Sequence, residues 1–191
     1  MFAVVLAVTL AFQWSSRAYD SEFGTIYPNE APHYVNGLLV ERYIDSLIHD
    51  DTAQSPLSFA TSFYLQYPKV SIGYWPPAFY VVEAAWMMIA SESKTAMIAL
   101  SGVMTALLAT LLGLVIGRRY GWIAGLVGGV VFAMALPVRN ITMALMVDVP
   151  LALMTFAATL IYIRYLSTPK WRYAALFGVT AAAAIMLKGN A

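Results

Sequence analysis

Residues 95–117 read TAMIALSGVMTALLATLLGLVIG, a run of 23 residues without a charged side chain. A helix needs roughly 20 apolar residues to cross a hydrocarbon core of about 30 Å, so this run is long enough to cross a membrane. Arg118 and Arg119 follow it directly, and basic residues gather on the cytoplasmic side of membrane helices. The run therefore predicts a transmembrane helix whose C-terminal end lies in the cytoplasm.

The composition of the chain indicates the same class of protein. Of its 191 residues, 61% are hydrophobic and 11% are charged, whereas soluble domains are nearer half apolar and a quarter charged. The net charge is +1, and no run of Lys and Arg with interleaved aromatics occurs, so nucleic acid is not an expected partner. The chain has no cysteine, which excludes disulfides and thiolate metal sites.

Further apolar windows lie on both sides of this run. They are residues 1–13, 78–90, 122–136, 151–163 and 172–187. We therefore expect an all-α fold, a polytopic transmembrane helix bundle, in which residues 1–13 are a short first span and residues 78–187 form the main bundle. Because an apolar helix closes where the chain ends, we also expect it to be a fragment of a longer module.

Residues 14–77 are the polar exception, and we expect them to form one outer loop. From Pro32 onward, apolar residues recur at three- and four-residue steps, with polar residues between them. This pattern predicts an amphipathic helix in the interface plane, with an apolar face of Val35, Leu38, Leu39, Tyr43 and Leu47, ended by Asp50 and Asp51. Residues 57–65 form a second, aromatic segment of the same interfacial kind.

Charge predicts the orientation of the chain. Arg164, Lys170 and Arg172 form a second basic cluster, expected in the cytoplasm together with Arg118 and Arg119, so Asp148 lies on the opposite side. If the outer loop shares the side of Asp148, one of the windows 78–90 and 95–117 does not cross completely. The shorter window, 78–90, carries Glu83 and is the one we expect to stop short.

Four motifs occur in a fixed order: residues 27–34 (YPNEAPHY), 67–80 (YPKVSIGYWPPAFY), 146–153 (MVDVPLAL) and 187–189 (LKG). Together with a short first span and an acidic first outer loop, they resemble the GT-C superfamily of membrane glycosyltransferases, which includes the protein O-mannosyltransferases and the bacterial aminoarabinose transferases of lipid A. The resemblance covers nearly the whole chain. It implies an enzyme that moves a sugar from a polyprenyl-phosphate donor to an acceptor hydroxyl on a lipid or a protein. It also implies a multi-pass protein, of the bacterial inner membrane rather than the endoplasmic reticulum, with the acidic loop periplasmic or lumenal.

The resemblance also implies roles for particular residues. Asn29 and Glu30 occupy the family's Asp-Glu pair, and Asp148 matches an acidic residue that opens a later helix. Glu30, Asn29 and Asp148 are therefore the catalytic candidates, with Glu30 as the base, and Glu30 and Asp148 are the ligands of a divalent metal if one is used. The substrate-binding candidates are Lys69 beside the donor phosphate, Tyr67, His33 and Tyr74. An amide cannot take up a proton as a carboxylate does, so either Glu30 replaces the missing aspartate or this copy is weak or inactive.

Each candidate also has a structural interpretation. Glu30 can be an acid stabilised at a helix N-terminus, Asp148 an N-cap, and Lys69 a lysine that extends to the headgroups. His33 is expected as a solvated interface histidine, and Lys188 as a helix end. The competing functions are an inactive or truncated remnant that acts as a membrane scaffold, and a small transporter-like bundle. Transporters usually show an internal repeat and this sequence shows none, so its single polar loop favours catalysis at the membrane surface.

Overall fold

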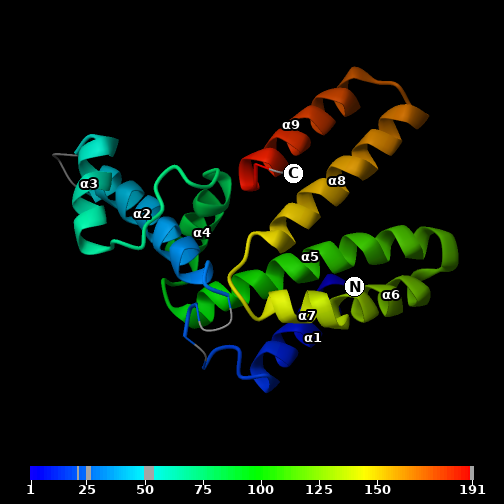
Figure 1. Cartoon of the computed structure of the whole chain (residues 1–191). Helices are drawn as coiled ribbons and strands as arrows, with labels where there is room; N and C mark the ends of the chain where they lie inside the picture. Colours follow the sequence, from blue (N-terminus) through cyan, green and yellow to red (C-terminus); the bar gives the residue numbers. More distant parts are fainter. Residues whose placement is uncertain (21, 25–26, 50–53, 190–191) are drawn as a thin grey trace.

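The computed structural model describes residues 1–20, 22–24, 27–49 and 54–189. Over these ranges the chain is all-α, with nine helices (Figure 1). Their bounds are α1 Phe2–Ser15, α2 Glu30–His49, α3 Pro56–Gln66, α4 Ala78–Ile89, α5 Lys94–Tyr120, α6 Trp122–Met134, α7 Leu136–Thr142, α8 Asp148–Ser167 and α9 Trp171–Leu187. Two of them, α5 and α8, are long and apolar enough to cross a membrane, and the bent pair of α6 and α7 makes a third span if it is counted as one.

Helix α5 is the centre of the bundle and packs against α1, α6 and α8. The turn between α5 and α6 and the turn between α8 and α9 lie at the end of the bundle away from α2 and α3 (Figure 1). Arg118 and Arg119 lie in the last turn of α5, and Arg164 lies in the last turn of α8. Both basic clusters therefore lie at the end of the bundle opposite to the polar loop.

Small residues let α5 and α6 approach closely. A Cβ atom on Gly125 would press on the carbonyl oxygen of Gly113 and would lie 2.9 Å from the Cα atom of Gly117. Such backbone contact between helices requires residues without a side chain at the crossing. The glycines of these two helices therefore determine how close the helices lie.

A buried glutamine joins α1 to the rest of the bundle. The side chain of Gln13 is fully buried, and its Nε2 donates hydrogen bonds of 2.8 Å to the carbonyl oxygens of both Ile98 and Thr142. Its Oε1 accepts a bond of 2.8 Å from the Tyr19 hydroxyl. A buried amide with its partners in place stabilises one arrangement, because any other arrangement would leave polar atoms unpaired. Gln13 thus fixes the position of α1 against α5 and α7.

The window predicted as residues 122–136 is interrupted. Helix α6 ends at Met134, and α7 begins at Leu136 after a bend of 65°. Pro137 lies in the first turn of α7, where the missing N–H of proline costs no helical hydrogen bond, whereas in a continuous helix it would remove one. The bend directs the chain toward the polar loop before α8 begins.

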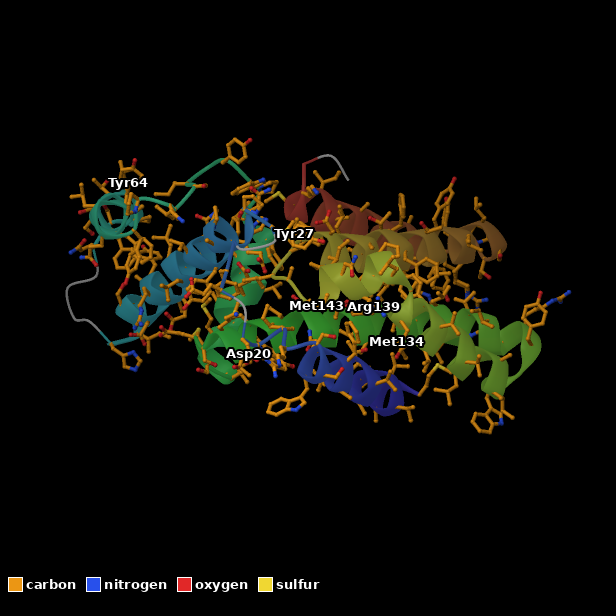
Figure 2. All side chains as sticks on the ribbon, turned by 60° about the horizontal axis from the view of Figure 1, so that its bottom comes forward. Asp20, Tyr27, Tyr64, Met134, Arg139 and Met143 are labelled. Carbon is orange, nitrogen blue, oxygen red and sulfur yellow. The ribbon has the colours of Figure 1, made fainter. Side chains whose placement is uncertain are left out.

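Helices α2 and α3 form an arm that leaves the bundle at its end opposite to the α5–α6 turn (Figures 1 and 2). Helix α2 begins at Glu30 and carries Pro32 in its first turn, close to the predicted start. The predicted end at Asp50 and Asp51 lies outside the described residues. Helix α3 is N-capped by Ser55, whose side chain accepts a hydrogen bond from the N–H of Ser58. Tyr64 on α3 lies far from the bundle (Figure 2).

The buried face of α2 differs from the apolar face that the sequence predicted. The buried residues are Glu30, His33, Asn36, Gly37, Leu38 and Glu41, whereas Leu47 is 51% exposed. Leu38 is buried as predicted, with Val35 and Leu39 packed against the same core. The prediction was wrong for the polar residues that it assigned to water, because α4 presents polar side chains of its own, Tyr80 and Glu83, toward α2. Polar residues of the two helices therefore pack together inside the protein.

Helix α4 stays on the side of the polar loop. Its 12 residues extend over about 18 Å at 1.5 Å per residue, which is too short to cross a hydrocarbon core of about 30 Å. Glu92, just after α4, is bound to α2, since its carbonyl oxygen accepts from the Tyr34 hydroxyl and its carboxylate pairs with Arg42. This arrangement agrees with the expectation that the window 78–90 stops short.

The close contact of α5 and α6 leads to a first prediction. We expect Gly125→Ala to lower the stability by about 1–3 kcal/mol, because a tightly packed core resists an added carbon. Thermal unfolding of the protein in nanodiscs should then show a midpoint lower by several degrees. Gly178→Ala in α9 is the control, since a Cβ atom there has nothing within 4 Å. Equal midpoints for the two variants would contradict the close packing.

Candidate functional site

An ion pair marks the place where α8 begins and α9 ends. Asp148 is the first residue of α8, Lys188 follows the last residue of α9, and Lys188 Nζ lies 2.9 Å from Asp148 Oδ1. About a third of each side chain is exposed, so the pair is accessible to a ligand. A carboxylate at a helix N-terminus and a cation at a helix C-terminus each interact favourably with the helix dipole. The α8–α9 hairpin therefore brings these two charges together.

A cavity of about 690 Å³ opens beside Lys188, while Asp148 lines a smaller, mostly apolar cavity of about 130 Å³. Residues 73–77 form one wall of the larger cavity, and Lys188 and Gly189 form another. The rings of Tyr74 and Trp75 meet edge to face with centroids 4.6 Å apart. The cavity thus combines an aromatic wall with a single ammonium group.

His33 lies behind the aromatic wall and is 3% exposed. Its ring centroid is 4.8 Å from that of Trp75 and 5.6 Å from that of Phe79, and its Nδ1 is 3.3 Å from the Tyr80 hydroxyl. Burial lowers the pKa of His33 to about 4, an effect that Asp148 opposes and Lys188 reinforces. His33 is therefore neutral at pH 7, and the expectation of a solvated interface histidine was wrong, because α4 covers this face of α2.

Glu30 is 5% exposed, and both of its carboxylate oxygens accept hydrogen bonds from the backbone. Oε1 accepts from the N–H of Leu145 at 3.0 Å, and Oε2 accepts from the N–H of Gly24 at 3.1 Å. Leu145 lies three residues before Asp148. Glu30 therefore connects the start of α2 to the segment that leads into α8, and it does not line the cavity.

The other predicted residues lie apart from the ion pair. Asn29 is exposed, and its carbonyl oxygen accepts a hydrogen bond from the N–H of His33. Lys69 is exposed in the turn between α3 and α4 and does not line the cavity. Tyr67 lines a different cavity, between α2 and α3. Of the predicted residues, the structure thus groups Asp148, His33 and Tyr74 around Lys188.

The residues at this place do not fit a divalent metal. Among the described residues, no three His, Cys, Asp or Glu side chains lie close enough together to hold an ion. The Asp148 carboxylate already faces a cation, and the Glu30 oxygens accept two N–H bonds. A hard divalent ion needs several free oxygen ligands, so we derive no step through a metal.

Sequence reasoning missed two features of this region. Lys188 was interpreted as a helix end, although it lies within the LKG motif. The second feature is a buried polar cluster between α2 and α4: neither carboxylate oxygen of Glu83 has a hydrogen-bond partner in the described part of the chain, and Glu83 presses against Gly37. The signal for this cluster was the spacing of Glu30, His33, Gly37 and Glu41, which places them on one helical face.

Comparison with known proteins gives no match: no family model, no curated protein and no solved structure is similar to this chain. The function must therefore be argued from the motifs and from the geometry of the site.

The two backbone bonds of Glu30 lead to a second prediction. In Glu30→Gln the side-chain amide oxygen can accept from only one of the two N–H groups, that of Leu145 or that of Gly24. The NH₂ group of the glutamine then faces the other N–H, which is left unpaired. An unpaired buried donor costs about 1–3 kcal/mol, so the unfolding midpoint should fall by several degrees. Asn29→Asp, at the exposed neighbouring position, is the control and should leave the midpoint nearly unchanged. A Glu30→Gln variant as stable as the parent would show that these two hydrogen bonds do not stabilise the fold.

The environment of His33 leads to a third prediction. Its pKa of about 4 in the folded chain compares with about 6.5 in an unfolded chain, so below pH 6.5 the unfolded chain binds a proton that the folded chain does not. Stability should therefore fall as the pH drops from about 6.5 to 4, by roughly 2–3 kcal/mol from this residue. His33→Gln should flatten this part of the pH profile, measured by thermal unfolding. His49→Gln, at an exposed position, should keep it.

Proposed function

We propose that this chain is the catalytic part of a multi-pass membrane glycosyltransferase of the GT-C type. It transfers a sugar from a polyprenyl-phosphate donor to an acceptor hydroxyl on a lipid or a protein. The observation that supports this most is the partly exposed Asp148–Lys188 pair, whose lysine lines an aromatic cavity at one end of a set of apolar helices. A lipid-borne phosphate and a water-borne acceptor would meet at such a place.

The reaction needs a base for the acceptor hydroxyl and a cation for the leaving phosphate. Lys188 Nζ is a compact positive charge that can bind phosphate, and a bound phosphate would compete with Asp148 for it. The freed Asp148 carboxylate would then take the proton of the acceptor hydroxyl. The acceptor oxygen bonds to the anomeric carbon, the bond from that carbon to the phosphate oxygen breaks, and the polyprenyl phosphate leaves with both electrons.

Asp148, rather than Glu30, is the base in this proposal. A general base must reach the proton it removes, and Glu30 is buried with both oxygens accepting backbone bonds. Glu30 is instead a positioning residue, which holds the segment before Asp148. Asn29 carries no charge and lies outside the cavity. The Tyr74 and Trp75 rings form a wall against which a sugar or a prenyl chain can pack.

The proposed location follows from the charges at the two ends of the bundle. With the basic turns in the cytoplasm, the cavity and the acidic loop face the periplasm of a bacterial inner membrane, or a lumen. In this proposal α5, α8 and the bent α6–α7 pair cross the membrane, and α9 crosses as well, because it leads from the cytoplasmic turn back to Lys188 beside Asp148. The arm of α2 and α3 lies on the outer side.

A second candidate is an inactive remnant that acts as a membrane scaffold. Two points favour it: Asn29 stands where the GT-C superfamily, which the motifs resemble, carries aspartate, and the charges of Asp148 and Lys188 already neutralise each other at 2.9 Å. A transporter-like bundle has less support, because the ion pair and the buried polar cluster lie at one end of the helices rather than midway along them.

The test is sugar transfer from polyprenyl-phosphate donors by the protein in liposomes. We expect Asp148→Asn to lower kcat about 10²–10⁴-fold, the usual contribution of a general base, and Lys188→Gln to weaken donor use. Lys170→Gln, at the opposite end of the bundle, is the matched control and should keep full activity. If the Asp148→Asn variant transfers sugar at the rate of the parent, Asp148 is not the base.

Two further results separate the alternatives. Loss of transfer in a folded Glu30→Gln variant, with a gain in Asn29→Asp, would place the base on the first outer loop instead. An absence of transfer by every variant and by the parent, with the protein folded and inserted, would favour the scaffold.

A further inference from the structure

A second cavity lies between α2 and α3, away from the Asp148–Lys188 pair. Its volume is about 290 Å³. Asp45, on its α2 side, is 15 positions beyond Glu30, which corresponds to about 22 Å along the helix. The cavity therefore belongs to the arm and is separate from the proposed catalytic site.

One wall of this cavity is a stack of aromatic rings. The rings of Phe59 and Phe63 are 25° from parallel with centroids 6.3 Å apart, and those of Phe63 and Tyr67 are 29° from parallel at 4.6 Å. Phe63 is buried, whereas Tyr67 is 42% exposed. The stack thus ends at Tyr67, whose ring packs on Phe63 and is partly exposed.

The rest of the lining is polar and offers mainly acceptors. The Ser46 hydroxyl donates to the carbonyl oxygen of Tyr43 at 2.8 Å, and the Ser62 hydroxyl donates to that of Phe59 at 2.9 Å, so each hydroxyl oxygen is left as an acceptor. The Asp45 carboxylate, with Oδ1 2.9 Å from His49 Nδ1, adds further acceptors. Gln66 supplies both an amide donor and an acceptor.

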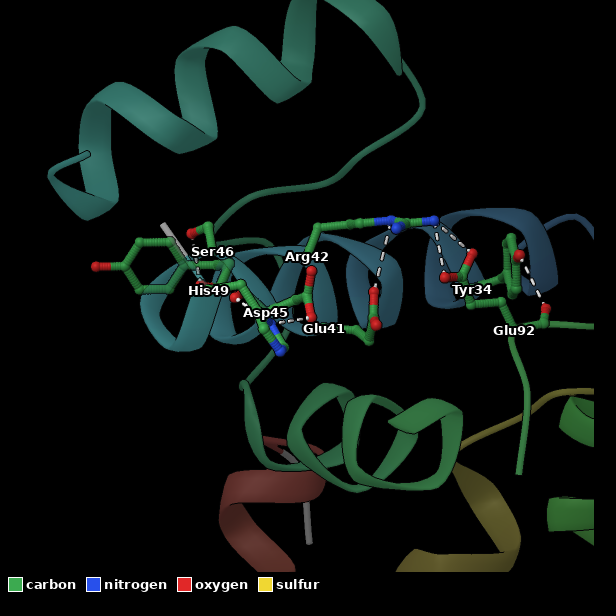
Figure 3. A network of polar contacts seen from close by, with 8 residues as sticks. Tyr34, Glu41, Arg42, Asp45, Ser46, His49 and Glu92 are labelled. Carbon is green, nitrogen blue, oxygen red and sulfur yellow. Dashed lines mark hydrogen bonds and ion pairs between the residues drawn. The ribbon is translucent and has the colours of Figure 1, made fainter. Parts of the chain in front are cut away.

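Arg42 lines the cavity, but two carboxylates compensate its positive charge. Its Nη2 lies 2.7 Å from both carboxylate oxygens of Glu92, and its Nε lies 3.6 Å from Glu41 (Figure 3). With Asp45 in the lining, three carboxylates surround the single Arg42 guanidinium, so a phosphate or carboxylate ligand would meet an excess of negative charge. The lining instead fits a neutral ligand that has several hydroxyl donors and one flat apolar face.

We propose that the α2–α3 cavity binds a saccharide. A sugar ring has a face of C–H groups, which packs on the Tyr67 ring, and hydroxyl groups around its edge, which donate to Asp45, Ser46 and Ser62. The volume of the cavity, about 290 Å³, is close to the lower end of the range for ligand pockets, roughly 300–1,000 Å³. The cavity therefore accommodates one or two rings. This site is independent of the proposed transfer reaction, and it would bind sugar even if the chain had no catalytic activity.

The experiment is saturation-transfer NMR on the full chain with methyl mannoside, methyl glucoside and N-acetylglucosamine as probes. The protein is held in nanodiscs, because a maltoside detergent carries a saccharide headgroup and would compete, and empty nanodiscs serve as the blank. We expect saturation of the ring protons of at least one probe. Tyr67→Ala should weaken binding at least tenfold and Asp45→Asn severalfold, while Tyr67→Phe should retain it.

Tyr64→Ala is the matched control, because it removes an exposed ring of the same kind from the same helix, α3, outside the lining of both cavities. It should leave binding of the probes unchanged. An absence of saturation for all three sugars would overturn the proposal. Binding that is lost in Tyr74→Ala and kept in Tyr67→Ala would also overturn it, and would place sugar recognition in the cavity beside Lys188.

Discussion

The Glu30 carboxylate connects two parts of the chain that lie 115 positions apart, through its hydrogen bond to the N–H of Leu145. Its other oxygen accepts from Gly24, so one buried side chain holds both the segment before α2 and the segment before α8. A buried carboxylate is stable only when hydrogen bonds compensate for its lost hydration. The position of Asp148 therefore depends on the bonds that Glu30 makes.

The ion pair of Asp148 and Lys188 is arranged differently from the Glu30 carboxylate. Asp148 and Lys188 remain partly exposed, and an exposed ion pair contributes little to stability. Such a pair can be separated by a competing anion at little cost. The structure thus combines a buried acid whose oxygens are held by the backbone with a partly exposed acid held by an ion pair, and the proposed roles of Glu30 and Asp148 rest on this difference.

Prediction from the sequence succeeded where long apolar runs or strong local signals were present. The run at residues 95–117 became α5, the apolar window before Lys188 became α9, and Pro32 marked the first turn of α2. It failed at His33 and along the face of α2, because the pattern of apolar residues does not show whether a polar face meets water or another polar face. Lys188 could not be recognised from its neighbours, since its partner Asp148 is 40 positions away.

The sequence by itself determined that the chain is helical, that several helices are apolar along their whole length, and that most acidic residues lie on one loop. These properties follow from composition and local spacing, which act within a few turns of a helix. Only the tertiary structure decided which polar residues meet: Glu30 with Leu145, His33 with Trp75, and Asp148 with Lys188. Each of these contacts joins distant segments, and its geometry is set by helix packing rather than by any single stretch of sequence.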